Sequence, residues 1–146
     1  MSKNLRLINY FISEFYSNNT FDLSHVVSPH FQFFSHTHEI KTFVDYVMRM
    51  DLLSNCCKLE ISSPETMDDV TFVTCFKMVI PRKHEPDIYT TGINSFVVKD
   101  DLLHRVFVHY NQDDEEYEKI QSALKNSYSV ISQSNRKIDS AASFFS

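Results

Sequence analysis

One histidine stands in a pattern that suits acid–base chemistry. His109 lies near the end of a predicted strand, two positions after Phe107 and four after Arg105, so the three share one face. A neutral imidazole with an ordinary pKa can accept or donate a proton near pH 7, as a general acid or base does. The alternative is a histidine in the core, or at its rim, that makes one hydrogen bond.

Two further polar residues could act with this histidine. Glu14 lies one turn beyond Leu7 and Phe11 in the first predicted helix, and Asn94 lies within a long predicted strand. An inward-facing Glu14 could pair with His109 or Asn94, whereas a glutamate at the edge of the apolar stripe stays solvated. His109, Glu14 and Asn94 are therefore the candidate catalytic residues.

The remaining histidines and the acidic residues give a weak metal pattern. His36 and His38 alternate, with His30 upstream, and two imidazoles on one strand face can hold zinc. Only Glu39 or Asp45 could complete the ligand set. The alternative is a set of ordinary polar loop residues, and we expect neither a metal nor a cofactor.

The three cysteines indicate neither a disulfide framework nor a nucleophile. Cys56, Cys57 and Cys75 form an odd set with two neighbours in sequence. A reactive thiol needs a cation or a helix N-terminus that lowers its pKa, and the sequence offers none beside them. We expect reduced, buried cysteines in a cytoplasmic protein.

Charge and glycine content exclude several function classes. The net charge of −5 argues against nucleic acid and anionic membranes as partners, because both require a positive surface. The single glycine excludes phosphate-binding loops and dinucleotide fingerprints. Gly92 falls inside a predicted strand, where it suggests a bulge or a bend. We expect Asn18-Asn19 and Asp100-Asp101 to take the positive-φ positions instead.

Hydrophobic periodicity predicts helices first and strands afterwards. We expect helices at 4–18, 21–27, 39–50 and 113–128, and strands at 30–34, 58–62, 70–80, 88–98 and 102–110. This order predicts an α+β fold with a mainly antiparallel sheet, as one domain over 1–128 with a serine-rich tail at 129–146.

Strand 102–110 has apolar residues on both faces, which predicts a homodimer through the outer face of the sheet.

Several segments together resemble the nuclear transport factor 2-like superfamily, which includes ketosteroid isomerases and polyketide cyclases. The segments are Phe15-Tyr16 with Asn19, Phe21-Asp22-Leu23, the strand from Pro29 to Phe34, the helix start at 40–43, and residues 96–101 with 103–106. The resemblance covers about residues 4–112. It implies a cone-shaped, cystatin-like α+β roll, with the N-terminal helices packed in the concave face of a strongly curved sheet around an apolar pocket.

The resemblance also implies positions for the site. The isomerase branch places a tyrosine, an acid and a carboxylate base where our alignment has Glu14, Asn94 and either Ser35 or His36. It directs His109 into the wide part of the pocket. The candidate ligand-binding residues are Phe11, Tyr16, Phe33, Phe43, Phe72, Thr74, Phe76 and Phe96.

We therefore expect a noncatalytic module that binds a small apolar or aromatic molecule in an internal pocket. The first alternative is an isomerase, cyclase or dehydratase that acts on a hydrophobic carbonyl substrate, with His109 as acid or base. The second is a dimeric protein-interaction module without catalysis.

Overall fold

Helices and strands are segregated along the chain, as the sequence pattern predicts. The computed structural model describes residues 1–17, 23–35, 39–40, 42–111, 115, 118–120 and 122, without the side chains of residues 40, 49 and 52–56. The elements are α1 (Lys3–Tyr16), the 3-10 helix η1 (Leu23–Val26), β1 (Val27–Phe34), β2 (Glu39–Ile40), α2 (Phe43–Cys56), β3 (Lys58–Ile61), β4 (Glu65–Thr66), β5 (Thr71–Ile80), β6 (Ile88–Lys99) and β7 (Leu102–Tyr110).

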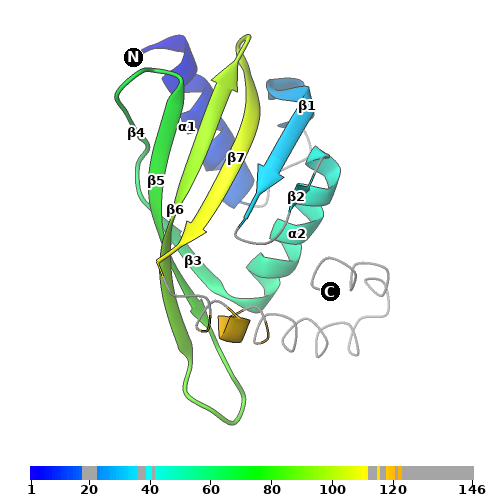
Figure 1. The fold of residues 1–146 in the computed structure, drawn as a ribbon, viewed down its shortest axis with the longest axis vertical. Coiled ribbons are helices and arrows are strands. Elements are labelled where there is room, and N and C mark those ends of the chain that lie inside the picture. The colour runs from blue at the N-terminus through cyan, green and yellow to red at the C-terminus, as the bar shows by residue number, and fades with distance from the viewer. Residues whose placement is uncertain are drawn as a thin grey trace.

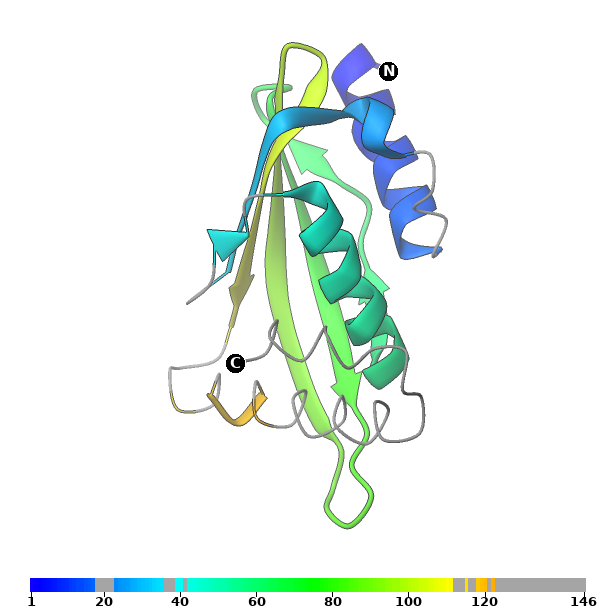
Figure 2. The same ribbon diagram turned by 90° about the vertical axis from the view of Figure 1, so that its right-hand side faces the viewer.

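The strands form one curved sheet, and both α-helices lie on the same side of it (Figure 1, Figure 2). The strand order is β2-β1-β7-β6-β5-β3, and β4 pairs with β5. The predicted antiparallel meander from residue 58 onward is confirmed. The pairing of β1 with β7 is parallel, so the sheet is mixed. The predicted α+β class is confirmed.

Helix α1 carries the apolar stripe that the sequence predicts. Ser2 caps the helix, because its hydroxyl accepts a hydrogen bond from the Leu5 amide at 3.0 Å. The side chains buried along the helix are Ile8, Phe11, Ile12 and Phe15. This spacing of three and four residues places them on one face, which packs into the main core.

The segment after β1 differs from the helix predicted at 39–50. Residues Glu39–Ile40 pair with the end of β1 as strand β2, and α2 begins only at Phe43. The Thr42 hydroxyl accepts a hydrogen bond from the Asp45 amide at 3.2 Å, as an N-cap residue does. Because helix periodicity alone does not locate a start, the N-cap threonine was the better boundary signal.

The predicted helix at 21–27 is a single 3-10 turn at 23–26, and β1 begins earlier than predicted, at Val27. The predicted helix at 113–128 is only partly described: residues 115, 118–120 and 122 are helical, and Ile120 is buried. Asn18-Asn19 and the predicted tail at 129–146 lie outside the described residues.

The turn between β6 and β7 is built on two aspartates, as predicted. Asp100 and Asp101 have φ values of 54° and 64°. Two successive positive φ values are typical of the two-residue hairpin turn that matches strand twist. The Lys3 ammonium contacts the Asp101 carboxylate at 3.0 Å and connects the start of α1 to this turn.

A register shift beyond this turn reverses the inward face of β7. Val98 pairs with Leu103 and Val97 pairs with Arg105, so His104 is an extra residue on β7. Leu103 is buried before the shift, and Val106 is buried after it. Strict alternation over the predicted strand 102–110 would place Leu103 on the face of Phe107, and the extra residue separates them.

Gly92 is not a bulge, which corrects the first of the two sequence-based alternatives, a bulge or a bend. The β5–β6 register is continuous through its pairing with Phe76, and its φ is not positive. A Cβ built on Gly92 would lie 2.5 Å from the His109 carbonyl oxygen and would overlap the Phe76 ring. The glycine therefore allows Phe76 and Tyr110, its two cross-strand partners, to meet edge-on with ring centroids 5.4 Å apart.

Replacing Gly92 should therefore destabilise the fold. We expect Gly92→Ala to lower the free energy of unfolding by about 1–3 kcal/mol, because the added methyl group overpacks a site bounded by backbone. Urea denaturation measures the change. Ser95→Ala, on the outward face of the same strand, is the control. A loss for Gly92→Ala no larger than that of the control would contradict the packing argument.

Candidate functional site

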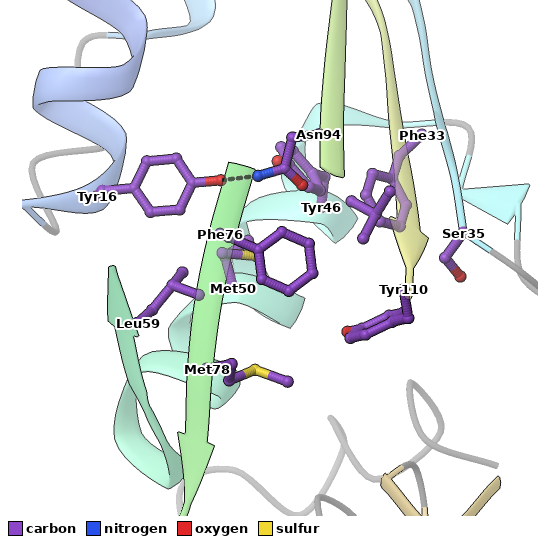
Figure 3. Close-up of a pocket in the computed structure, with 11 residues that line it drawn as sticks. Tyr16, Phe33, Ser35, Tyr46, Met50, Leu59, Phe76, Met78, Asn94 and Tyr110 are labelled. Atoms are coloured by element: carbon purple, nitrogen blue, oxygen red, sulfur yellow. Dashed lines mark hydrogen bonds between the residues drawn. The ribbon is translucent and has the colours of Figure 1, made fainter. Parts of the chain in front are cut away.

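A cavity lies between the concave face of the sheet, the end of α1 and one face of α2 (Figure 3). Its volume is about 40 Å³. Pockets for drug-sized ligands reach about 300–1,000 Å³, so this cavity suits only a small molecule. The described lining residues are Tyr16, Phe33, Ser35, Tyr46, Met50, Leu59, Phe76, Met78, Asn94, Val108 and Tyr110.

Tyr16 supplies a hydroxyl group at one end of this cavity. It is the last residue of α1, and its hydroxyl oxygen accepts a hydrogen bond from the Asn94 amide nitrogen at 3.4 Å (Figure 3). Tyr46, from α2, makes a second side-chain hydrogen bond with Tyr16 that favours the ionised phenol. Because Asn94 donates to the Tyr16 oxygen, that contact leaves the hydrogen of the Tyr16 hydroxyl available as a donor.

Burial fixes the protonation state of Tyr16. Desolvation raises its pKa well above the usual range of a phenol and outweighs the opposing hydrogen bond from Tyr46, while the nearby Tyr110 raises it further. Tyr16 is therefore a neutral hydrogen-bond donor throughout the physiological pH range and cannot serve as a base there.

Asn94 is a buried amide with unused hydrogen-bonding capacity. Its side chain is 4% exposed, and in the described part of the chain its one side-chain hydrogen bond is the long contact to Tyr16. Thr74 lies directly opposite on β5, is 1% exposed, and its hydroxyl has no partner among the described groups. Buried polar groups are normally paired, so the Asn94 amide, which lines the cavity, can take a polar atom of a ligand.

Apart from Ser35 and the other tyrosines, the remaining wall is apolar and can partly rearrange. Phe33 and Phe76 contribute aromatic surface from β1 and β5, and Val108 contributes a methyl-lined patch of β7. Met50 and Met78 complete the wall. Methionine side chains are unbranched and flexible, so they can rearrange around ligands of different shape.

The predicted ligand-binding residues divide into two groups. Tyr16, Phe33 and Phe76 line the cavity, as does Asn94 from the catalytic set. The others, which are Phe11, Phe43, Phe72, Thr74 and Phe96, are not among its described lining residues. Phe11, Phe72 and Phe96 are fully buried in the core, and Phe43 packs against it. The presence of an aromatic side chain in the sequence does not show whether it lines the cavity or packs in the hydrophobic core.

His109 does not face the cavity, which corrects the expectation from the resemblance. It is exposed on the outer face of β7, and it does not line the described cavity. The physical reason is the extra residue at His104, which directs Val106, Val108 and Tyr110 inward. Glu14 is half-buried on α1 and does not line the cavity either.

The hydroxyl expected from the family pattern comes from a different position. The alignment placed Glu14 where the isomerase branch has a tyrosine, whereas the structure brings Tyr16 to Asn94. Of the two residues aligned with the base, Ser35 lines the cavity and His36 lies outside the described residues. The structure thus places Tyr16, and not Glu14, beside Asn94 in the described cavity.

Sequence reasoning missed two tyrosines of the site. Tyr46 could have been found from its spacing with Phe43, Val47 and Met50, which follows the helical period. Val44, on the other side of this helix, is 67% exposed. Tyr110 ends β7, and the bulge that directs it inward has no clear sequence signal.

Metal and thiol chemistry find little support in the described residues. Among them, no three His, Cys, Asp or Glu residues form a group that could hold a metal ion. His36 and His38 lie outside this set. Cys75 is exposed and Cys57 half-buried, so the expectation of buried cysteines is wrong for Cys75.

None of the described helices is long and apolar enough to cross a membrane.

The raised pKa of Tyr16 predicts a loss of stability in alkali. The folded-state pKa of Tyr16 lies above its unfolded value near 10. The contribution of Tyr16 to the free energy of unfolding is therefore complete below pH 10 and declines as pH rises further. We expect the wild type to lose about 1.4 kcal/mol per pH unit more than Tyr16→Phe above pH 10. Urea denaturation from pH 8 to 11 tests this, and parallel curves would show that Tyr16 is not buried.

Comparisons with known proteins identify the fold. No protein-family model matches the sequence, and no curated protein matches it. A candidate SnoaL-like polyketide cyclase from Jannaschia sp. CCS1 superposes with a TM-score of 0.63 at 8% identity, over 84% of this chain and 91% of that one. An NTF2-like protein from Burkholderia xenovorans LB400 gives 0.63 at 7% identity, over 75% and 89%.

A third solved structure gives the same result. An LEH-like epoxide hydrolase from M. tuberculosis gives a TM-score of 0.57 at 8% identity, over 90% of this chain and 94% of that one. Identities this low establish architecture rather than activity. The curved mixed sheet and the helices on its concave side thus give this chain the nuclear transport factor 2-like fold.

Proposed function

We propose that this protein binds a small, largely apolar molecule and holds a hydrogen-bond acceptor of that molecule, such as a carbonyl oxygen, at Tyr16 and Asn94. One observation carries the proposal: the Tyr16 hydroxyl lies beside the buried Asn94 amide at one end of a largely apolar cavity. A hydrogen bond from a neutral, largely desolvated phenol is a strong orienting contact.

Binding fits the cavity better than proton-transfer catalysis does. The titratable residues in the described lining are Tyr16, Tyr46 and Tyr110, and phenols normally titrate far above neutral pH. A general acid or base works best with a pKa near the working pH. The neighbours named as cyclases and hydrolases support a cavity with a ligand, and the groups lining this cavity favour a binding module.

A ketone and its hydrocarbon analogue test the role of Tyr16. We expect acetophenone to bind more tightly than ethylbenzene, which has nearly the same shape and no oxygen. Tyr16→Phe should reduce affinity for acetophenone by about 2- to 10-fold, because one hydrogen bond contributes about 0.5–1.5 kcal/mol. NMR titration gives the dissociation constants.

The matched control lies on the same helix. Tyr10 is 41% exposed, so Tyr10→Phe also removes one phenolic hydroxyl of α1 but should leave the affinity unchanged. Equal affinity for the two compounds, or equal behaviour of the two variants, would contradict the proposal.

We also propose a homodimer through the outer face of the sheet. Phe34 and Phe107 stack there with ring centroids 5.1 Å apart, and Phe107 remains 37% exposed. Tyr89 on the same face is 72% exposed. An apolar area of this kind on a sheet is most simply covered by a second copy of the same face.

Sedimentation measures the association state directly. We expect the wild type to sediment as a dimer and Phe107→Asp as a monomer, because a carboxylate in the interface would be desolvated without a partner. His84→Asp, which adds a charge in the exposed β5–β6 loop, should stay dimeric. A single wild-type species near 17.1 kDa would rule out the dimer.

A further inference from the structure

The cavity carries a second polar group that the proposed function does not use. Ser35 lines the cavity at the end opposite Tyr16 (Figure 3). Its hydroxyl oxygen is buried and has no hydrogen-bond partner among the described groups. Since an unpaired buried hydroxyl is unfavourable, native structures rarely keep one without a reason. Rotation about a single bond can direct this hydroxyl to a ligand.

The sheet register places this serine in line with the polar groups at the other end. Asn94 pairs directly with Val108 on one side and with Thr74 on the other. Continuing the parallel β1–β7 register by one residue places Ser35 beside Val108. The four residues therefore form one row across β1, β7, β6 and β5. Neighbouring strands lie about 4.8 Å apart, so the Ser35 and Asn94 positions are separated by about 9–10 Å.

This row is polar at both ends of the cavity and apolar between them. Asn94 and the Tyr16 hydroxyl form one polar end, and the unpaired Thr74 hydroxyl adjoins it. Ser35 forms the other. Val108 lies between the two ends, and Phe33 and Phe76 contribute apolar surface to the same cavity. A purely apolar ligand would leave the hydroxyl of Ser35 unpaired.

We infer that the ligand class is a small molecule with one hydrogen-bonding group at each end of an apolar middle: an acceptor for Tyr16 and Asn94, and a hydroxyl for Ser35. The inference rests on the proposed function and adds the second polar contact. The cavity volume of about 40 Å³ is smaller than the roughly 150 Å³ of a cavity that holds benzene. A short chain fits best, a single ring requires the flexible Met50 and Met78 side chains to rearrange, and multi-ring molecules are excluded.

Three compounds of nearly equal shape test the two ends separately. 4′-Hydroxyacetophenone carries both groups, 4′-methylacetophenone replaces the hydroxyl with a methyl group, and 4-ethylphenol replaces the ketone with methylene. At pH 6 all three are neutral. We expect NMR titration to show that the first compound binds about 3- to 10-fold more tightly than either analogue, as one hydrogen bond in a dry site would give.

The Ser35→Ala variant tests the assignment to this residue. We expect it to abolish the preference for 4′-hydroxyacetophenone over 4′-methylacetophenone, while the preference over 4-ethylphenol, which depends on Tyr16, persists. Tyr16→Phe should have the opposite pattern. Ser95→Ala removes a serine hydroxyl from the outward face of β6 and should keep both preferences.

The outcomes separate this inference from the proposed function. If the wild type binds the hydroxyl and methyl compounds equally, or if Ser35→Ala keeps the preference for the hydroxyl, the second polar contact is wrong and the Tyr16 contact stands. If none of the three compounds binds, both are wrong. The inference is supported if Ser35→Ala loses the preference for the hydroxyl compound while Tyr16→Phe and Ser95→Ala keep it.

Discussion

The extra residue at His104 determines which side chains of β7 reach the interior. Before it Leu103 is buried, and after it Val106, Val108 and Tyr110 turn inward while His109 turns outward. Because strand side chains alternate with a period of two, one inserted residue exchanges the two faces for the rest of the strand. Because of this exchange, Val108 and Tyr110 line the cavity and Tyr110 contacts Phe76 beside Gly92. The same exchange places the imidazole of His109 outside the cavity.

The aromatic residues have two separate roles. Near the start of the chain they make a dense core, in which Phe11 stacks on Phe15 and Phe15 on Tyr46, with ring centroids 5.0 and 4.9 Å apart. Toward the other end of the sheet, Phe76 and Tyr110 meet over Gly92 and leave space beside them. Tyr46 belongs to both regions, since its ring packs in the core and its hydroxyl bonds to Tyr16.

The polar groups of the cavity favour recognition over proton transfer. A phenol whose pKa is raised by burial donates a hydrogen bond but does not exchange its proton near neutral pH. The amide of Asn94 does not ionise near neutral pH, so it cannot act as a general acid or base. Neutral donors at fixed positions select a ligand by the location of its polar atoms, which is how an apolar pocket acquires specificity.

The sequence by itself determined the α+β class, the meander after residue 58, the apolar face of α1 and the aspartate turn, because these depend on local periodicity and turn chemistry. It also indicated Tyr16, Phe33, Phe76 and Asn94, which line the cavity. Only the tertiary structure decided the parallel β1–β7 pairing, the face of β7 and the rotation of α2 that brings Tyr46 inward. The physical reason is that strand partners, bulges and helix rotation are set by contacts between segments distant in sequence, which local patterns do not record.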